Sequence, residues 1–288
     1  MLEYFSPEFD GAFYRLRYGD LHKHSDVELK QHFDLHGRSE GRLASPMALR
    51  SNFVATFINA NKALEIGPFN KPMLAGSNSK FFDVLDQDGL RKRAVSINES
   101  PDRVPTINYV SPKGDINIIV DKFDLIVSSH CVEHQPDLVR HLQGVERLLE
   151  PAGVYALLVP DCRYCFDYSL APTHIGQVLE AFHEERKVHR LASVVEHRAL
   201  TTHNDPQRHW HGDHGEVTFN ISRVKDAILE WENSGGAYID VHAWQFNPDS
   251  FATIINGLYD LNLTKLRVHR VYHTPFGSNE FYAVLATS

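Results

Sequence analysis

The side chains that are best placed for chemistry in this sequence stand shortly after apolar runs. The run 123–127 is followed by the pair Glu133-His134, and the run 153–159 is followed by Asp161. The unperturbed pKa of histidine lies in the working range of most enzymes, so His134 is suited to take a proton from a substrate. Asp161 ends a second strand, faces the same edge, and would either orient His134 or bind a substrate hydroxyl. The sequence therefore predicts a general-base site built from two neighbouring strand ends.

A third apolar segment, 62–66, ends in a Glu-x-Gly-Pro turn formed by Glu65, Gly67 and Pro68. Because glycine has no Cβ, the backbone of such a turn can approach a ligand closely. This turn indicates a binding site for a nucleotide-type cofactor. The alternative is a buried strand end followed by an ordinary turn.

Apolar runs alternate with helical patterns along most of the chain, which is typical of parallel strands joined by right-handed crossovers. The last two runs are separated by the turn-rich segment 273–279, which indicates a hairpin. We therefore expect an α/β fold with a Rossmann-like, mostly parallel seven-stranded sheet that ends in an antiparallel hairpin. The expected strands are 62–66, 80–84, 106–110, 123–128, 153–159, 265–271 and 279–286.

The order and spacing of three segments, 62–68, 123–134 and 148–161, resemble the class I S-adenosylmethionine-dependent methyltransferases. The Glu-Ile-Gly-Pro opening is similar to that of a type 11-like branch found in bacterial polysaccharide assembly. This resemblance implies S-adenosylmethionine as cofactor and a displacement in which the enzyme aligns donor and acceptor while a base removes the proton of a hydroxyl. The first loop departs from the family pattern, because Phe69 follows where a second glycine is usual.

The resemblance also implies further cofactor contacts. Asp83 ends the second apolar run, where a carboxylate would accept hydrogen bonds from the ribose, and Asp86 is its close competitor. Asp115 stands where the family often places an acceptor for the adenine amine. Ser129 and His130 follow the fourth run and would face the methionine or adenosine part.

A histidine-rich insert, 162–245, follows the fifth strand and is expected to form a helical lid over the carboxyl edge of the sheet. Helical patterns cover 174–200 and 220–232. The insert carries His203, His209, His211 and His214 close together, a set of donors that suits either a sugar or a divalent metal. No metal-ligand spacing stands out, so sugar binding by His209, Trp210 and His211 is favoured and no metal ligand is assigned. His242 and Trp244 are expected in the same substrate pocket, unless they lie in a strand with a mixed interior.

Residues 1–45 form a separate unit of short helical patterns that closes on His36-Gly37-x-x-Glu40-Gly41. The aromatic-Pro-Glu opening and the His-Gly-x-x-Glu-Gly-Arg ending are similar to a small helical module found beside glycosyltransferases. A helix cap over one sheet edge is the alternative. We expect the methyltransferase domain to occupy 46–288, and a glycosyltransferase is an expected partner or neighbouring domain.

Composition limits the classes of partner. The chain has 288 residues, a net charge of −8 and a pI near 6.1, and it has no long block of like charges, which argues against nucleic acid. No apolar stretch is long enough to span a membrane, and three cysteines without a leader-like N-terminus indicate a cytoplasmic protein. Oligomeric state is not indicated.

These patterns together predict an O-methyltransferase that acts on a sugar hydroxyl in polysaccharide or glycan biosynthesis, with a histidine base. Two alternatives stay open. One is an N-methyltransferase or a small-metabolite methyltransferase, in which His134 binds or orients its acceptor. The other is a non-catalytic domain of the same fold that serves as a scaffold in a glycan-assembly complex.

Overall fold

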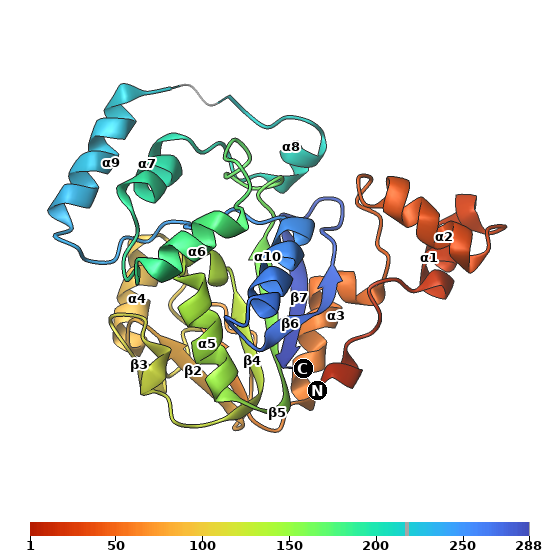
Figure 1. The fold of residues 1–288 in the computed structure, drawn as a ribbon, viewed down its shortest axis with the longest axis horizontal. Coiled ribbons are helices and arrows are strands. Elements are labelled where there is room, and N and C mark those ends of the chain that lie inside the picture. The colour runs from red at the N-terminus through yellow and green to blue at the C-terminus, as the bar shows by residue number, and fades with distance from the viewer. Residues whose placement is uncertain (217–218, 288) are drawn as a thin grey trace.

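The computed structural model describes residues 1–216 and 219–287. One seven-stranded sheet stands between two layers of helices, and a lobe of helices lies above one end of its strands (Figure 1). A small helical unit at the N-terminus lies to one side of the sheet. None of the helices in these described ranges is both long and apolar enough to cross a membrane.

The sheet has the strand order β3-β2-β1-β4-β5-β7-β6. Neighbouring strands from β3 to β5 pair in parallel, whereas β7 is antiparallel to both β5 and β6. The predicted seven-stranded sheet and its terminal antiparallel hairpin are therefore confirmed. The strands are β1 (Ala63–Ile66), β2 (Ser79–Asp83), β3 (Tyr109–Val110), β4 (Phe123–Ser129), β5 (Leu149–Pro160), β6 (Leu266–Tyr272) and β7 (Glu280–Thr287).

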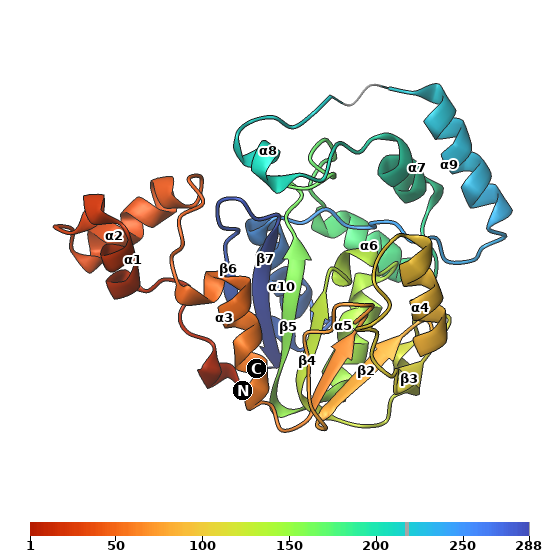
Figure 2. The same ribbon diagram turned by 180° about the vertical axis from the view of Figure 1, so that it is seen from behind.

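Both faces of the sheet are buried, which explains why its central strands read as continuous apolar runs. Alternate residues of β4 point to opposite faces, so that Ile126 packs in one apolar cluster while Leu125 and Val127 pack in the other. The first cluster is completed by α5 (Leu138–Leu148), α6 (Ile175–His183) and α10 (Pro248–Asp260). The second is completed by α3 (Arg50–Ala55), which Figure 2 shows on the opposite face. The helix α4 (Gln87–Ser96) follows β2.

The insert after β5 divides into two parts. Its first helix, α6, joins the main core through Val178 and Ala181. The helices α7 (Leu191–Ala199), α8 (Pro206–Trp210) and α9 (Ile221–Asn233) form the lobe above the carboxyl ends of the parallel strands (Figure 1). The helical pattern predicted over 174–200 is thus two helices, because the polar segment between Glu184 and Arg190 interrupts it, and α8 was not predicted.

The N-terminal unit has its own small core. The helices α1 (Gly11–Arg17) and α2 (Asp26–His32) and the following turn Phe33–Gly37 enclose Tyr14, Leu21, Leu29 and Phe33. The unit is joined to the sheet at the free edge of β6, where the Glu8 carboxylate accepts a hydrogen bond from the Val271 amide. The chain then leaves the unit at Gly41, whose carbonyl accepts from the Phe276 amide at 2.9 Å.

A buried carboxylate shapes the loop after β1. Glu65 is 2% exposed, and its two oxygens accept hydrogen bonds from the amides of Met73 and Leu74 at 2.9–3.1 Å. Burial raises the pKa of Glu65 to about 7, while these two hydrogen bonds and the charge of Arg50 act in the opposite direction. Glu65 therefore holds the loop after β1 in place, with its carboxylate directed at the loop backbone.

We expect the free energy of unfolding to depend less on pH in the Glu65→Gln variant than in the wild type. The folded pKa of Glu65 lies above its unfolded value, so its contribution to the free energy of unfolding is fully present below about pH 4.5 and is lost as the pH rises to about 7. Urea unfolding at pH 5 and pH 8 should show the wild type weakening relative to Glu65→Gln by up to about 3 kcal/mol. The exposed Glu150→Gln substitution serves as control, and an equal response of wild type and Glu65→Gln to pH would contradict this account.

Gly144, in the middle of α5, is fixed by close packing. A Cβ built there would lie 2.6 Å from Cδ1 of Ile116, the residue that follows Asp115. Alanine usually stabilises a helix interior by up to about 1 kcal/mol over glycine, but overpacking typically costs about 1–3 kcal/mol. We expect Gly144→Ala to lower the free energy of unfolding by about 1 kcal/mol. The loss should shrink in the Ile116→Val background, which a double-mutant cycle measured in urea can show; an unchanged loss would mean that Ile116 is not the obstacle.

Candidate active site

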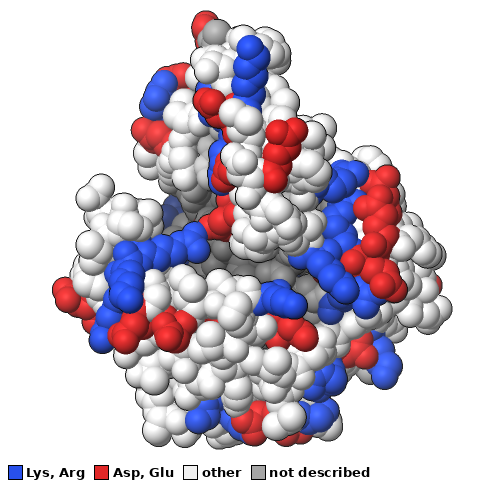
Figure 3. Space-filling view, turned by 90° about the vertical axis from the view of Figure 1, so that its left-hand side faces the viewer, with Lys and Arg blue, Asp and Glu red and all other residues white. Residues whose placement is uncertain are grey.

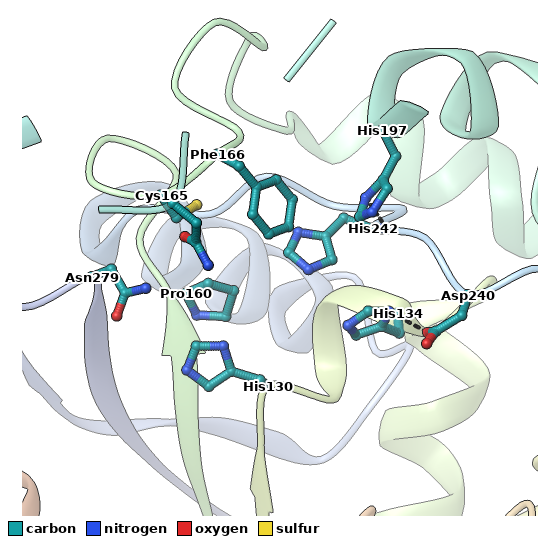
Figure 4. A pocket seen from close by; sticks show the side chains of 10 residues that line it. His130, His134, Pro160, Cys165, Phe166, His197, Asp240, His242 and Asn279 are labelled. Carbon is teal, nitrogen blue, oxygen red and sulfur yellow. Dashed lines mark hydrogen bonds and ion pairs between the residues drawn. The ribbon is translucent and has the colours of Figure 1, made fainter. Parts of the chain in front are cut away.

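A cavity of about 280 Å³ lies at the carboxyl ends of β4 and β5, beneath the insert (Figure 4). Most of its lining is polar, and four of the side chains are imidazoles. The lining residues are His130, His134, Pro160, Cys165, Phe166, His197, Asn204, Asp240, His242 and Asn279.

The predicted base, His134, ends the short 3-10 helix Val132–His134 that follows β4. Its Nδ1 lies 3.1 Å from Oδ1 of Asp240, which also forms an ion pair with Arg93 of α4. Burial disfavours the charged form of His134, but the carboxylates of Asp240 and Glu133 outweigh it and raise the pKa of this imidazole. The pKa of the Asp240 carboxyl group is lowered, chiefly by its hydrogen bond with His134. His134 is thus oriented by a residue of the insert.

His242 reaches the cavity from the end of the insert. Its Nδ1 lies 2.6 Å from Oδ2 of Asp167, and both side chains are almost fully buried. Burial lowers the pKa of His242 to about 3 and raises the pKa of Asp167 to about 7. The position of His242 is set by the backbone, since the amides of Ala243 and Trp244 donate to the Glu133 carbonyl at 2.7 and 3.3 Å.

Glu133 lies beneath the two imidazoles and is completely buried. Its Oε1 is 3.7 Å from Nε2 of His134 and 3.9 Å from Nε2 of His242. Within the described ranges, neither oxygen of this carboxylate has a hydrogen-bond partner. A third imidazole near Glu133 is that of His130, which has a backbone φ of +50°. Its Nε2 lies 2.9 Å from the Glu280 carboxylate.

Asp161 is not the residue that orients His134, and this expectation was wrong. The Asp161 carboxylate is fully buried and accepts two hydrogen bonds from the Arg163 side chain, at 2.9 and 2.6 Å. The Thr274 hydroxyl donates a third at 2.6 Å. These donors tie the start of the insert to the segment between β6 and β7, so Asp161 fixes the cavity wall, whereas Asp240 orients the imidazole.

The predicted cofactor residues lie along the same sheet edge, after β1 and β2. Gly67 has a φ of +70°, and its amide donates to the Phe82 carbonyl at 2.9 Å. Pro68 follows as a buried turn residue. Asp83 ends β2 in a buried position and accepts from the Val84 amide at 2.7 Å, and burial raises the pKa of its carboxyl group.

The remaining cofactor candidates have local contacts. Asp86 is exposed and caps α4 by accepting from the Gly89 amide at 2.8 Å. Asp115 is also exposed and caps a 3-10 turn through the Asn117 amide at 2.9 Å. Ser129 is the last residue of β4, and its hydroxyl accepts from Arg50 at 3.4 Å.

Only one of the five predicted substrate residues, His242, lines the cavity. The Trp210 ring stacks on Tyr164 with centroids 3.8 Å apart, and its indole N–H donates to the Ser278 carbonyl. The Trp210 ring therefore stacks within the insert and its N–H attaches the insert to the segment between β6 and β7, contrary to the expectation that it holds a sugar ring.

Trp244 was wrongly placed in the substrate pocket, because it belongs to the main core and donates to the Gln135 carbonyl at 2.7 Å. His209 is buried against the His203 carbonyl and the His214 ring, and His211 is exposed with its Nδ1 2.6 Å from the Gln207 carbonyl. The histidines between 203 and 214 thus form a group of their own outside the cavity lining.

Sequence reasoning did not assign four residues that complete the site: Glu133, Asp167, His197 and Asp240. Glu133 and Asp240 were within the segments that carried the predicted histidines, at Glu133-His134 and Asp240-x-His242. That adjacency was a usable signal. Asp167 and His197 had none, because the path of the insert decides that Asp167 contacts His242 and that His197 lines the cavity.

The surface is hollowed between the lobe of the insert and the body that contains the sheet, with Lys and Arg side chains on the rim of the hollow (Figure 3). One of the links across this region is the ion pair between Arg93 of α4 and Asp240 of the insert. Because β1 and β4 are adjacent and parallel, the loop after β1 and the histidine cavity after β4 lie at the same edge of the sheet.

Residues 81–157 match a family model described as a methyltransferase domain. No curated protein matches the sequence. The fold is similar to the mitomycin 7-O-methyltransferase MmcR, at 12% identity over 94% of this chain and 60% of that one, with a TM-score of 0.40.

It is also similar to an S-adenosylmethionine-dependent methyltransferase from Clostridium acetobutylicum, at 10% identity over 91% and 98% of the two chains, with a TM-score of 0.43. A third similar structure is the CcbJ methyltransferase from Streptomyces caelestis, at 13% identity over 82% and 94%, with a TM-score of 0.39. Scores and identities this low carry no information about the acceptor. The matched stretch, which runs from β2 to β5, is a methyltransferase domain, and the cofactor of this enzyme is S-adenosylmethionine.

Proposed function

We propose that this protein transfers the methyl group of S-adenosylmethionine to a hydroxyl group of a sugar during polysaccharide or glycan biosynthesis in the cytoplasm. The observation that carries the proposal is the polar cavity at the ends of β4 and β5, where oriented imidazoles face the edge that holds the cofactor loop. A polyhydroxylated acceptor needs many hydrogen-bond partners, and the imidazole, amide and carboxylate groups of this cavity offer them.

In this proposal the cofactor lies across the ends of β1, β2 and β4. The turn at Gly67 and Pro68 receives the methionine part of the cofactor. Gly67 has a positive φ and no Cβ, so its backbone can approach the ligand closely. Asp83 accepts the ribose hydroxyls in preference to Asp86, because Asp83 ends the strand while Asp86 is engaged in capping α4. Asp115 is the proposed acceptor for the adenine amine.

His134 is the proposed base for the acceptor hydroxyl. With a proton on Nδ1 facing Asp240, its Nε2 keeps a lone pair directed into the site. The Asp240 carboxylate would then stabilise the imidazolium that forms as the hydroxyl attacks the methyl group, with the hydroxyl proton passing to Nε2. Ser129 and His130 are proposed to lie beside the reacting sulfonium.

The choice of a sugar also rests on the N-terminal unit, which resembles modules that accompany glycosyltransferases. Its exposed surface, away from the cavity, is the proposed contact for a glycosyltransferase partner or domain. The argument for a sugar acceptor thus rests on the company that such modules keep with glycosyltransferases. The identity of the acceptor that the enzyme methylates tests it.

Calorimetric titration with S-adenosylmethionine and S-adenosylhomocysteine tests the cofactor site. We expect binding to weaken at least about tenfold in Asp83→Asn, because hydrogen bonds to a charged acceptor contribute about 1.5–3 kcal/mol each. A larger loss in Asp86→Asn than in Asp83→Asn would reverse the assignment of the ribose carboxylate. The exposed Asp88→Asn substitution on α4 is the matched control, and absence of binding in the wild type would favour the scaffold alternative.

Methyl transfer to a panel of nucleotide sugars and oligosaccharides, followed by mass spectrometry and mapping of the methylated position, tests the reaction. We expect O-methylated product, with a rate about 10² to 10⁴ lower in His134→Gln and unchanged cofactor binding. The exposed His183→Gln substitution at the end of α6 is the control. Product from free amines alone would identify an N-methyltransferase.

A further inference from the structure

The Glu133 carboxylate lies behind the imidazoles that line the cavity, and neither of its oxygens is satisfied within the described ranges. It is fully buried, and both its oxygens lack a hydrogen-bond donor in the part of the chain that the structure describes. A buried carboxylate without a donor is costly, because desolvation of the charge is not compensated. Such a position favours a ligand that supplies positive charge.

Three imidazole nitrogens surround this carboxylate. From Oε1 of Glu133 the distances are 3.7 Å to Nε2 of His134, 3.9 Å to Nε2 of His242 and 3.9 Å to Nδ1 of His130. These gaps are too long for hydrogen bonds. They are close to the separation of about 3.4 Å between two ligands of one tetrahedral ion with bonds of about 2.1 Å. The ligand atoms of Glu133, His134 and His242 lie within 4.8 Å of one another.

The opposite nitrogen of each imidazole faces a carboxylate. Nδ1 of His134 lies 3.1 Å from Asp240, and Nδ1 of His242 lies 2.6 Å from Asp167. In metal sites a ligating histidine usually donates its other N–H to such a group, which fixes the tautomer and directs the remaining lone pair at the ion. His130 has the same arrangement, with Nε2 2.9 Å from Glu280.

We propose that Glu133, His134 and His242 bind a divalent transition-metal ion through one carboxylate oxygen and two Nε2 atoms. His130 stands next to these ligands, and the cavity leaves an open coordination position for the acceptor. Two nitrogen donors and one oxygen suit zinc and its neighbours in the first transition row, whereas magnesium and calcium prefer oxygen ligands.

A second set of donors, Asp167, His197 and His242, also lies within 4.8 Å. It is the weaker candidate, because Oδ2 of Asp167 and Nδ1 of His242 are already hydrogen-bonded at 2.6 Å. Two ligands of one ion do not approach each other so closely, so Asp167 acts as the partner of a ligating histidine.

The metal site deepens the proposed function, on which its catalytic meaning rests. A bound cation would use the Nε2 lone pair of His134. In the metal-loaded protein, the charge of the cation would lower the pKa of the coordinated acceptor hydroxyl, which would lose its proton to water as it attacks the methyl group. In the metal-free protein His134 would act alone.

The test uses tag-free, full-length protein from which metal has been removed with a chelator and dialysis. Zinc is titrated by calorimetry, and cobalt is followed by its visible absorption spectrum. We expect one equivalent to bind, with affinity reduced more than about 100-fold in Glu133→Gln and His242→Gln, and about 10- to 100-fold in Asp167→Asn. His183→Gln, at an exposed position that does not line the cavity, should bind as the wild type does.

Folding of each variant is checked by circular dichroism, and Asp167→Asn keeps the test valid if a ligand variant fails to fold. No binding, or one equivalent that survives Glu133→Gln and His242→Gln, would overturn the metal site; the latter result would locate the ion elsewhere, for example at His203, His209 and His214. Binding of S-adenosylhomocysteine, measured in the same preparations, separates this failure from failure of the proposed function.

Discussion

The arrangement of the active site depends on one residue, Glu133, placed directly after the central strand β4. Its side chain brings a carboxylate into the interior, and its backbone carbonyl accepts hydrogen bonds from Ala243 and Trp244. The same residue therefore introduces the charge and fixes the segment that carries His242. Trp244 then anchors that segment in the main core. The two ends of the insert are also held together, because the Cys162 amide donates a hydrogen bond to the Phe246 carbonyl at 2.7 Å.

His134 and His242, two of the four histidines that line the cavity, have opposite pKa shifts, because burial dominates at His242 whereas the neighbouring carboxylates outweigh burial at His134. Asp240 is 42% exposed and pairs with Arg93, so it stays ionised and favours the charged form of His134. Asp167 is buried, which raises its pKa to about 7, and its neighbour His242 is neutral with a pKa of about 3. Within one cavity, the imidazole of His134 is therefore protonated readily, whereas that of His242 is not.

The sheet and its edge could be predicted from sequence because buried parallel strands leave a strong local signal. Apolar patterns located all seven strands, although β3 covers only Tyr109–Val110 of the expected 106–110, and the polar residues after the strands located the ends of β1, β2 and β4. The partners of the histidines could not be predicted, since Asp240 meets His134 and Asp167 meets His242 only through the path of the insert. Two tryptophans, Trp210 and Trp244, were wrongly predicted to bind substrate. Each has an apolar ring that packs against the protein and an N–H that donates to a backbone carbonyl, so neither needs a ligand.

The strand order explains why donor and acceptor can meet. In the order β2-β1-β4-β5, the strand that leads into the proposed cofactor loop lies beside β4, which is followed by the 3-10 helix that carries Glu133 and His134. Adjacent strands are about 4.8 Å apart, so groups that are far apart in sequence project from the same edge. The connections from β1 and from β4 lead to opposite sides of this point, which opens a crevice there. In the proposed reaction, a methyl group held over β1 would face the acceptor held over β4, and the insert would cover the crevice and supply His242.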